Sequence, residues 1–173
     1  MRTMHCVGAT AVAALLFLAC GGGSVPDGPI GTLDSEQDYA RFMQAIALPL
    51  VGVLIELEDR TSADDPAACP SGGTAAIDRA LGQVTFSACL LGGISISGTA
   101  VLAQGASTGP DKSAFLAGAQ LTLSGGATGL VLMQLAELAW QDPPTEAGTT
   151  WKASFESGMS AHICVQSSGE PCS

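Results

Sequence analysis

The chain has 173 residues and a formal net charge of −10, with 16 acidic residues against 6 basic ones. This balance argues against nucleic acid as a partner, because binding it requires Lys and Arg to replace the counterions of the phosphates. It also predicts repulsion from anionic lipid headgroups. About 150 residues follow the first apolar stretch, which is enough for one domain with its own core.

The start of the chain has the pattern of an export signal. Arg2 and the amino terminus supply positive charge, and the run Val7–Ala19 that follows is small and apolar. Its 13 residues are too few to cross about 30 Å of hydrocarbon, so a transmembrane anchor is disfavoured. A charged start, a short apolar run and a small-residue cleavage point predict a signal peptide over residues 1–19.

The end of this segment resembles the lipobox of bacterial lipoproteins, where Leu, a small residue, and Ala or Gly precede a cysteine. The four positions here are Phe17-Leu18-Ala19-Cys20; the last two match the family, and the first two depart from its preferred types. The resemblance implies that Cys20 carries the lipid and that a membrane is one partner. An ordinary signal-peptidase cut at this point is the alternative, and it would release a soluble protein.

Location and tethering follow from the same resemblance. The residue after Cys20 is Gly21 rather than Asp, and lipoproteins of this type are generally sent to the outer membrane in bacteria with two membranes. The resemblance therefore implies a lipid-anchored place in the cell envelope, at the outer membrane. The Gly- and Pro-containing segment 20–33 is predicted to be a tether, because it has little to bury and Gly leaves its backbone free.

One long helix is predicted after the tether. The stretch Asp34–Gln37 provides a capping side chain and acidic residues near the positive end of the helix dipole. The segment Ala45–Ile55 is apolar on all sides, so it requires cover all round, either on a sheet or within a curled one. Apolar residues recur at the spacing of one helix face, at Tyr39, Phe42, Met43, Ile46, Leu50, Val53, Leu54 and Leu57.

Beyond Thr74 apolar and polar residues alternate, which predicts short antiparallel strands joined by Gly-containing turns. The segment Leu130–Trp140 is compatible with a helix, but its length and the glycines at its start favour a strand. Residues 34–173 are expected to form one α+β domain, with the helix packed on a curved antiparallel meander of about six or seven strands. The alternative is an all-β sandwich with a peripheral helix. The predicted strands are Val84–Cys89, Ile94–Thr99, Ser113–Ser124, Thr128–Gln141, Thr149–Glu156 and Met159–Gln166.

Four cysteines lie in this domain, and an even number in an exported chain implies two disulfides. Three connectivities exist, of which Cys69–Cys89 and Cys164–Cys172 are preferred because each pair is local and flanked by turn residues. A zinc site is not expected, since no pair has the C-x-x-C spacing and His162 is the only histidine after the signal.

One motif invites a catalytic interpretation. The segment Gly105–Gly109 matches G-x-S-x-G, which in esterases places a serine, here Ser107, on a turn between a strand and a helix. A strand-like run follows it here, and a triad would need His162 with Glu156 or Glu170. A Gly/Ser/Thr loop between strands explains the match without catalysis, so ester hydrolysis ranks last among the functions considered.

Other site signals are weak. The pair Asp64-Asp65 lacks the EF-hand spacing that calcium requires. The Gly pairs are not followed by the helix and Lys of a phosphate-binding loop. His162 is expected on the polar face of its strand beside Ser160 and Cys164. No metal, cofactor or nucleic acid is therefore predicted.

The favoured function is a non-enzymatic lipoprotein of the cell envelope with a structural or interaction role, whose partner would be an envelope protein. The alternative is a carrier of a lipid or other apolar ligand between the helix and the curved sheet. In that case Ala45–Ile55 would line the cavity with Phe86, Phe115 and Leu132. A cavity of several hundred Å³ would favour the carrier, and a filled core would favour the structural role.

Overall fold

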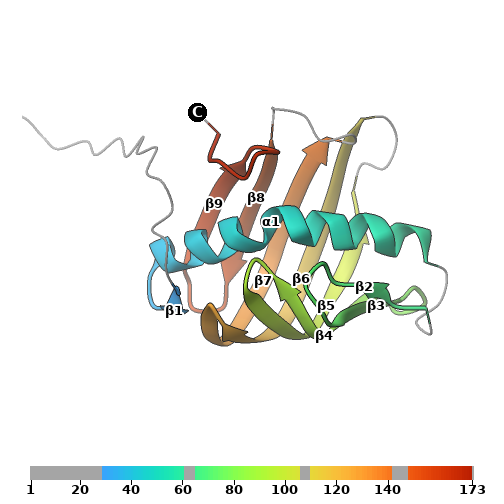
Figure 1. The fold of residues 1–173 in the computed structure, drawn as a ribbon, viewed down its shortest axis with the longest axis horizontal. Coiled ribbons are helices and arrows are strands. Elements are labelled where there is room, and N and C mark those ends of the chain that lie inside the picture. Colours follow the sequence, from blue (N-terminus) through green and yellow to red (C-terminus); the bar gives the residue numbers. More distant parts are fainter. Residues whose placement is uncertain (1–28, 61–64, 106–109, 142–147, 173) are drawn as a thin grey trace, which may run out of the picture.

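A computed structural model describes residues 29–60, 65–105, 110–141 and 148–172. This part of the chain forms one helix and a sheet of nine strands, as Figure 1 shows. The predicted class, a helix with a largely antiparallel sheet, is confirmed. The helix α1 covers Glu36–Asp59, and the strands are β1 (Gly31–Thr32), β2 (Ala67–Ala68), β3 (Thr74–Asp78), β4 (Gln83–Leu91), β5 (Ile94–Gln104), β6 (Asp111–Gly125), β7 (Ala127–Gln141), β8 (Thr149–Phe155) and β9 (Ser160–Val165).

The predicted strands correspond to β4–β9, and the ambiguous segment Leu130–Trp140 lies inside β7. The structure has more strands than the six or seven expected. The reason is that β1 and β2 contain two residues each, too short for an alternating pattern. Because β1 pairs with the start of β7, the folded body begins inside the segment 20–33 that was predicted to be a tether.

The strands follow the chain in the order β2 to β9, and each pairs with the next in antiparallel fashion. Only β1 is added in parallel, on β7. The described strands thus form one sheet, so the alternative of a two-sheet sandwich with a peripheral helix is wrong. Figure 1 shows this sheet curving around α1, which crosses its concave face.

Irregular pairings produce the curvature. The extra residues at the register shifts lie on β4, β6 and β7, and such bulges bend a strand and increase its twist. Gly98 in β5 has φ 140°, and a Cβ there would overlap the carbonyl oxygen of Gln120 in β6. Glycine therefore permits the close approach of β5 and β6. The shifts lie between Phe86 and Cys89, Thr99 and Val101, and Met133 and Leu135.

The helix begins at the predicted cap and buries the predicted stripe. The hydroxyl of Ser35 accepts a hydrogen bond of 3.2 Å from the backbone N–H of Asp38, which satisfies one donor of the first turn. All eight apolar residues predicted to form the stripe are buried. By length and composition α1 is apolar enough to cross a membrane, but 50% of that window is buried inside the domain. Burial of this kind is typical of a core helix.

The helix contacts several strands, most extensively β9, and also β2, β3, β4, β7 and β8. On β8, the Phe155 ring lies 4.0 Å from that of Tyr39, and Trp151 lies 6.4 Å from Phe42, between ring centroids. On the turn between β4 and β5, a Cβ at Gly92 would overlap the carbonyl oxygen of Ala45. Aromatic rings from one strand and a glycine turn from another hairpin thus meet the helix.

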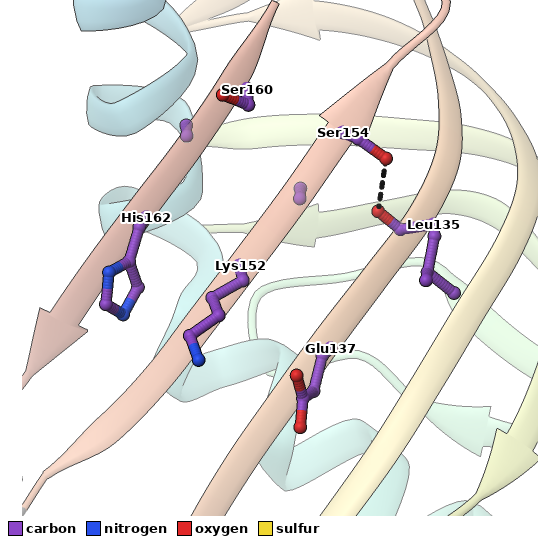
Figure 2. A pocket seen from close by; sticks show the side chains of 8 residues that line it. Leu135, Glu137, Lys152, Ser154, Ser160 and His162 are labelled. Atoms are coloured by element: carbon purple, nitrogen blue, oxygen red, sulfur yellow. Dashed lines mark hydrogen bonds between the residues drawn. The ribbon is translucent and has the colours of Figure 1, made fainter.

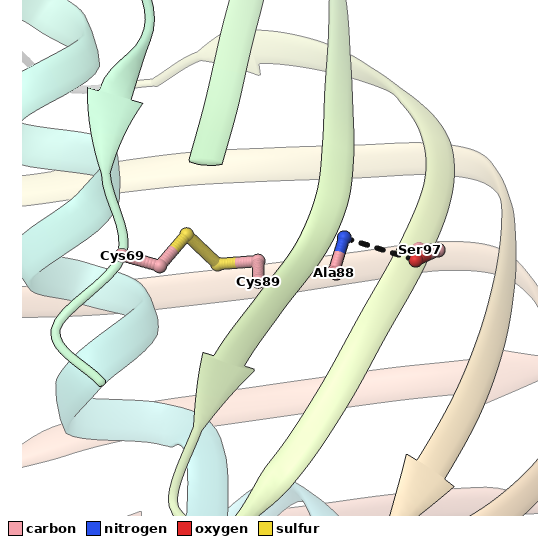
Figure 3. Close-up of a disulfide and its surroundings, with 4 residues drawn as sticks. All are labelled: Cys69, Ala88, Cys89 and Ser97. Carbon is pink, nitrogen blue, oxygen red and sulfur yellow. Dashed lines mark hydrogen bonds between the residues drawn. A yellow bond between two sulfur atoms is a disulfide. The ribbon is translucent and has the colours of Figure 1, made fainter. Parts of the chain in front are cut away.

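Both predicted disulfides are present. Cys69 and Cys89 join the segment after β2 to β4, and Cys164 and Cys172 join β9 to the end of the chain. Figure 3 shows the first of them beside the bulge of β4. There Ala88 has φ 48° and its N–H donates to the hydroxyl of Ser97 over 3.0 Å.

Candidate functional site

An open pocket of about 280 Å³ lies beside α1 at the end of β9, lined by Gln44, Ala45, Leu48, Pro49, Val165 and Gly169. Between the buried stripe of α1 and the concave face of the sheet, side chains fill the space. The cavity left among them is about 10 Å³, which is about the minimum for one water molecule. An apolar ligand of several hundred Å³ does not fit there without displacement of the core. The cavity is lined by Ile46, Leu50, Phe86, Ile96, Leu116, Leu121, Met133 and Trp151.

Two of the residues expected to line a ligand cavity lie on the other face of the sheet. Phe86 is buried on the side of the helix. Phe115 is half-buried and alternates with buried Leu116, and half-buried Leu132 precedes buried Met133. Since successive side chains of a strand point to opposite faces, the expectation that Phe115 and Leu132 line that cavity is wrong.

These two residues belong to an apolar area on the outer, convex face of the sheet, here called the convex patch. Val101 of β5 is the register partner of Ala117 in β6, which in turn is the partner of Leu135 in β7. Val101 is 47% exposed and Leu135 is 49% exposed. The convex patch consists of Val101, Ala103, Phe115, Ala117, Leu132 and Leu135.

A polar groove of about 380 Å³ adjoins the convex patch at Leu135. Glu137 of β7, Lys152 of β8 and His162 of β9 are successive register partners across three strands. Figure 2 shows these three side chains on the same side of the sheet, with the hydroxyl of Ser154 donating to the carbonyl oxygen of Leu135 over 3.4 Å. The groove is lined by Leu135, Glu137, Lys152, Ala153, Ser154, Ser160, Ala161 and His162.

The charges of the chain are unevenly placed. The convex patch contains no charged residue, and the polar groove contains one acidic and one basic residue besides His162. In the described structure no hydrogen bond or ion pair is formed by the side chains of Glu137, Lys152 or His162. Acidic residues gather instead around the two ends of α1, at Asp34, Glu36, Asp38, Glu56, Glu58 and Asp65.

The residues singled out in the sequence are only partly placed. His162 is exposed on β9, and it shares a face with Ser160 and Cys164 as predicted. Cys20 and Ser107 lie outside the described residues. No group of three or more His, Cys, Asp or Glu residues that could hold a metal occurs among the described ones.

The alternation in the sequence missed the convex patch for a specific reason. Met133 is buried, so a regular strand would also bury Leu135. The bulge between them leaves Gln134 and Leu135 both exposed and Ala136 buried. No single-strand pattern reveals that shift.

Comparisons of the chain with models of protein families, with curated proteins and with solved structures found no match.

Proposed function

We propose that the protein is a lipoprotein of the cell envelope, anchored through Cys20, with a non-catalytic interaction role. One observation carries the interaction role. The core between the sheet and the buried stripe of α1 leaves a cavity of only about 10 Å³, while apolar side chains are exposed on the outer face of the described sheet. Exposed contiguous apolar patches mark sites of interaction with proteins or membranes.

The helix held in the curve of the sheet supports this role over that of a carrier. A carrier needs a cavity of roughly 300–1,000 Å³ for its ligand. Here the apolar residues of α1 instead contact sheet residues, as Phe42 does Trp151. The domain is then a rigid body that interacts with partners through its outer surface.

The anchor is supported by the sequence of residues 7–20 and by the two disulfides. Disulfides persist in oxidising compartments such as the periplasm and are rare in the cytoplasm. Cys69–Cys89 and Cys164–Cys172 therefore favour export. The expected location is the outer membrane of the cell envelope.

The test is to express the full chain in a bacterium with a lipoprotein pathway and analyse the mature protein by mass spectrometry. We expect an amino-terminal cysteine carrying acyl chains, and a globomycin-sensitive precursor. The Cys20→Ala variant, the matched control, should lose the modification and fractionate away from membranes. An unmodified amino terminus would contradict the anchor. Stoichiometric lipid bound without a covalent link would instead support the carrier.

A further inference from the structure

We propose that the convex patch and the polar groove together dock on the lipid bilayer that holds Cys20, with phospholipid headgroups seated in the groove. This inference rests on the proposed function, because it takes the anchor as given. It assigns the lipid surface itself as the occupant of the uncovered face.

The convex face carries a continuous apolar surface. Val101, Ala117 and Leu135 form a continuous row across three strands, and the two large members of this row are about half exposed. Leu130, on the same face of β7, is 62% exposed. Solvent exposure of such side chains is unfavourable by roughly 25 cal/mol per Å². Contact with lipid removes that area from water.

The distribution of charge favours an approach to lipid through the convex face. A chain with a net charge of −10 is repelled as a whole by anionic headgroups. The convex patch is uncharged, and the acidic ends of α1 lie on the opposite side of the sheet. Glu156, whose N–H donates to the carbonyl oxygen of Leu132, marks an acidic margin of the patch. Asp111 of β6 and Glu137 of the groove also lie on the convex face. This face still carries fewer of the described acidic residues than the side of α1, so it is the approach with less negative charge.

The polar groove matches the chemistry of a zwitterionic headgroup. Phosphatidylethanolamine carries a phosphate and an ammonium group a few bonds apart. Lys152, His162 and the hydroxyl of Ser160 supply donors for the phosphate, and Glu137 supplies acceptors for the ammonium. Because Glu137 and Lys152 are register partners but form no ion pair in the described structure, both are available to a headgroup.

The segment between Cys20 and β1 is short. Nine residues lie between Cys20 and Ile30, so the ten steps of chain keep the body within about 35 Å of the anchored cysteine. The chain enters the fold through β1, which pairs with Ala127 and Thr128 at the start of β7. The same strand then carries Leu130, Leu132 and Leu135. The tether thus joins the body at one end of the strand that leads to the patch.

A second copy of the chain is a poorer occupant of this face. Two convex surfaces touch over a small area, whereas a stable protein interface buries about 1,600 Å². A lipid surface deforms to the shape that it contacts, so curvature does not limit its contact area in the same way.

The test uses the mature lipidated protein in vesicles of phosphatidylethanolamine with a minority of phosphatidylglycerol and brominated acyl chains, which quench tryptophan. Leu135→Trp places a reporter on the patch, and Gln37→Trp places the matched control on the exposed side of α1. Trp140 and Trp151 are buried and give the same background in both. We expect bromine quenching of the added tryptophan in Leu135→Trp, and none in Gln37→Trp.

A second variant tests the groove. Lys152→Glu in the Leu135→Trp background should lose part of the quenching, and Lys152→Arg should retain it. Equal quenching in all three proteins would overturn the headgroup site.

The outcomes also separate this inference from the proposed function. A lipidated protein that floats with vesicles but shows no added quenching, or quenching in Gln37→Trp alone, overturns the docking and leaves the anchor intact. Dimers formed without quenching would also overturn it, in favour of a second copy. A protein that lacks lipid and does not float overturns both.

Discussion

The guanidinium of Arg79 donates a hydrogen bond of 2.9 Å to the carbonyl oxygen of Leu57 in the last turn of α1. The same side chain also reaches the carbonyl oxygens of Glu58 over 2.6 Å and Arg60 over 2.7 Å. The last turn of α1 contains no basic residue of its own. The turn between β3 and β4 therefore supplies the cation that a helix carboxyl end favours, and it ties the helix to the sheet.

Removal of this cap should destabilise the fold. Arg79→Gln is expected to lower the free energy of unfolding by about 1–3 kcal/mol, because it removes charge-assisted hydrogen bonds to helix carbonyls. Urea unfolding followed by circular dichroism measures the change. Arg79→Lys keeps the charge without the planar fork and should be intermediate. Equal stability of all three proteins would show that the contacts contribute nothing.

The two glycines of the β4–β5 turn should respond differently to alanine. Gly92 and Gly93 have φ 54° and 79°, and alanine at either position loses about 1–2 kcal/mol from its backbone conformation. Only at Gly92 would the new Cβ overlap a backbone atom, the carbonyl oxygen of Ala45. Gly93→Ala meets nothing within 4 Å and is the matched control.

We expect Gly92→Ala to lose about 2–4 kcal/mol, more than Gly93→Ala, since overpacking adds its own cost. Thermal unfolding of both variants gives the order. Equal losses would mean that the turn does not lie against the helix backbone.

The two disulfides should differ in their contribution to stability. In the chain-entropy model, a loop of 20 residues (Cys69–Cys89) contributes about 3 kcal/mol, and one of 8 residues (Cys164–Cys172) about 2.5 kcal/mol. The first pair is also buried, so its replacement by alanine leaves space in the core. Chemical denaturation of the Cys69→Ala/Cys89→Ala and Cys164→Ala/Cys172→Ala proteins should place the first well below the second. The reverse order of stability would contradict the expectation that the Cys69–Cys89 disulfide stabilises the core more than the other one does.

The sequence was sufficient for features that depend on neighbouring residues. A cap within Asp34–Gln37 follows from the residue types at the helix start, and the apolar stripe of α1 follows from a period of 3.6 residues. Neither needs knowledge of the rest of the chain. Strand β7 was identified from its flanking glycines and length. The cysteine pairs were identified because each is close in sequence.

Only the tertiary structure decided which face Leu135 occupies, and with it the candidate site. A bulge forms between two paired strands, so its effect on the side chains of one strand does not appear in that strand's own alternation. The same holds for Phe115 and Leu132, whose apolar character fits a core as well as a surface. The cap from Arg79 likewise depends on how a sheet turn meets a helix end 22 residues away in sequence.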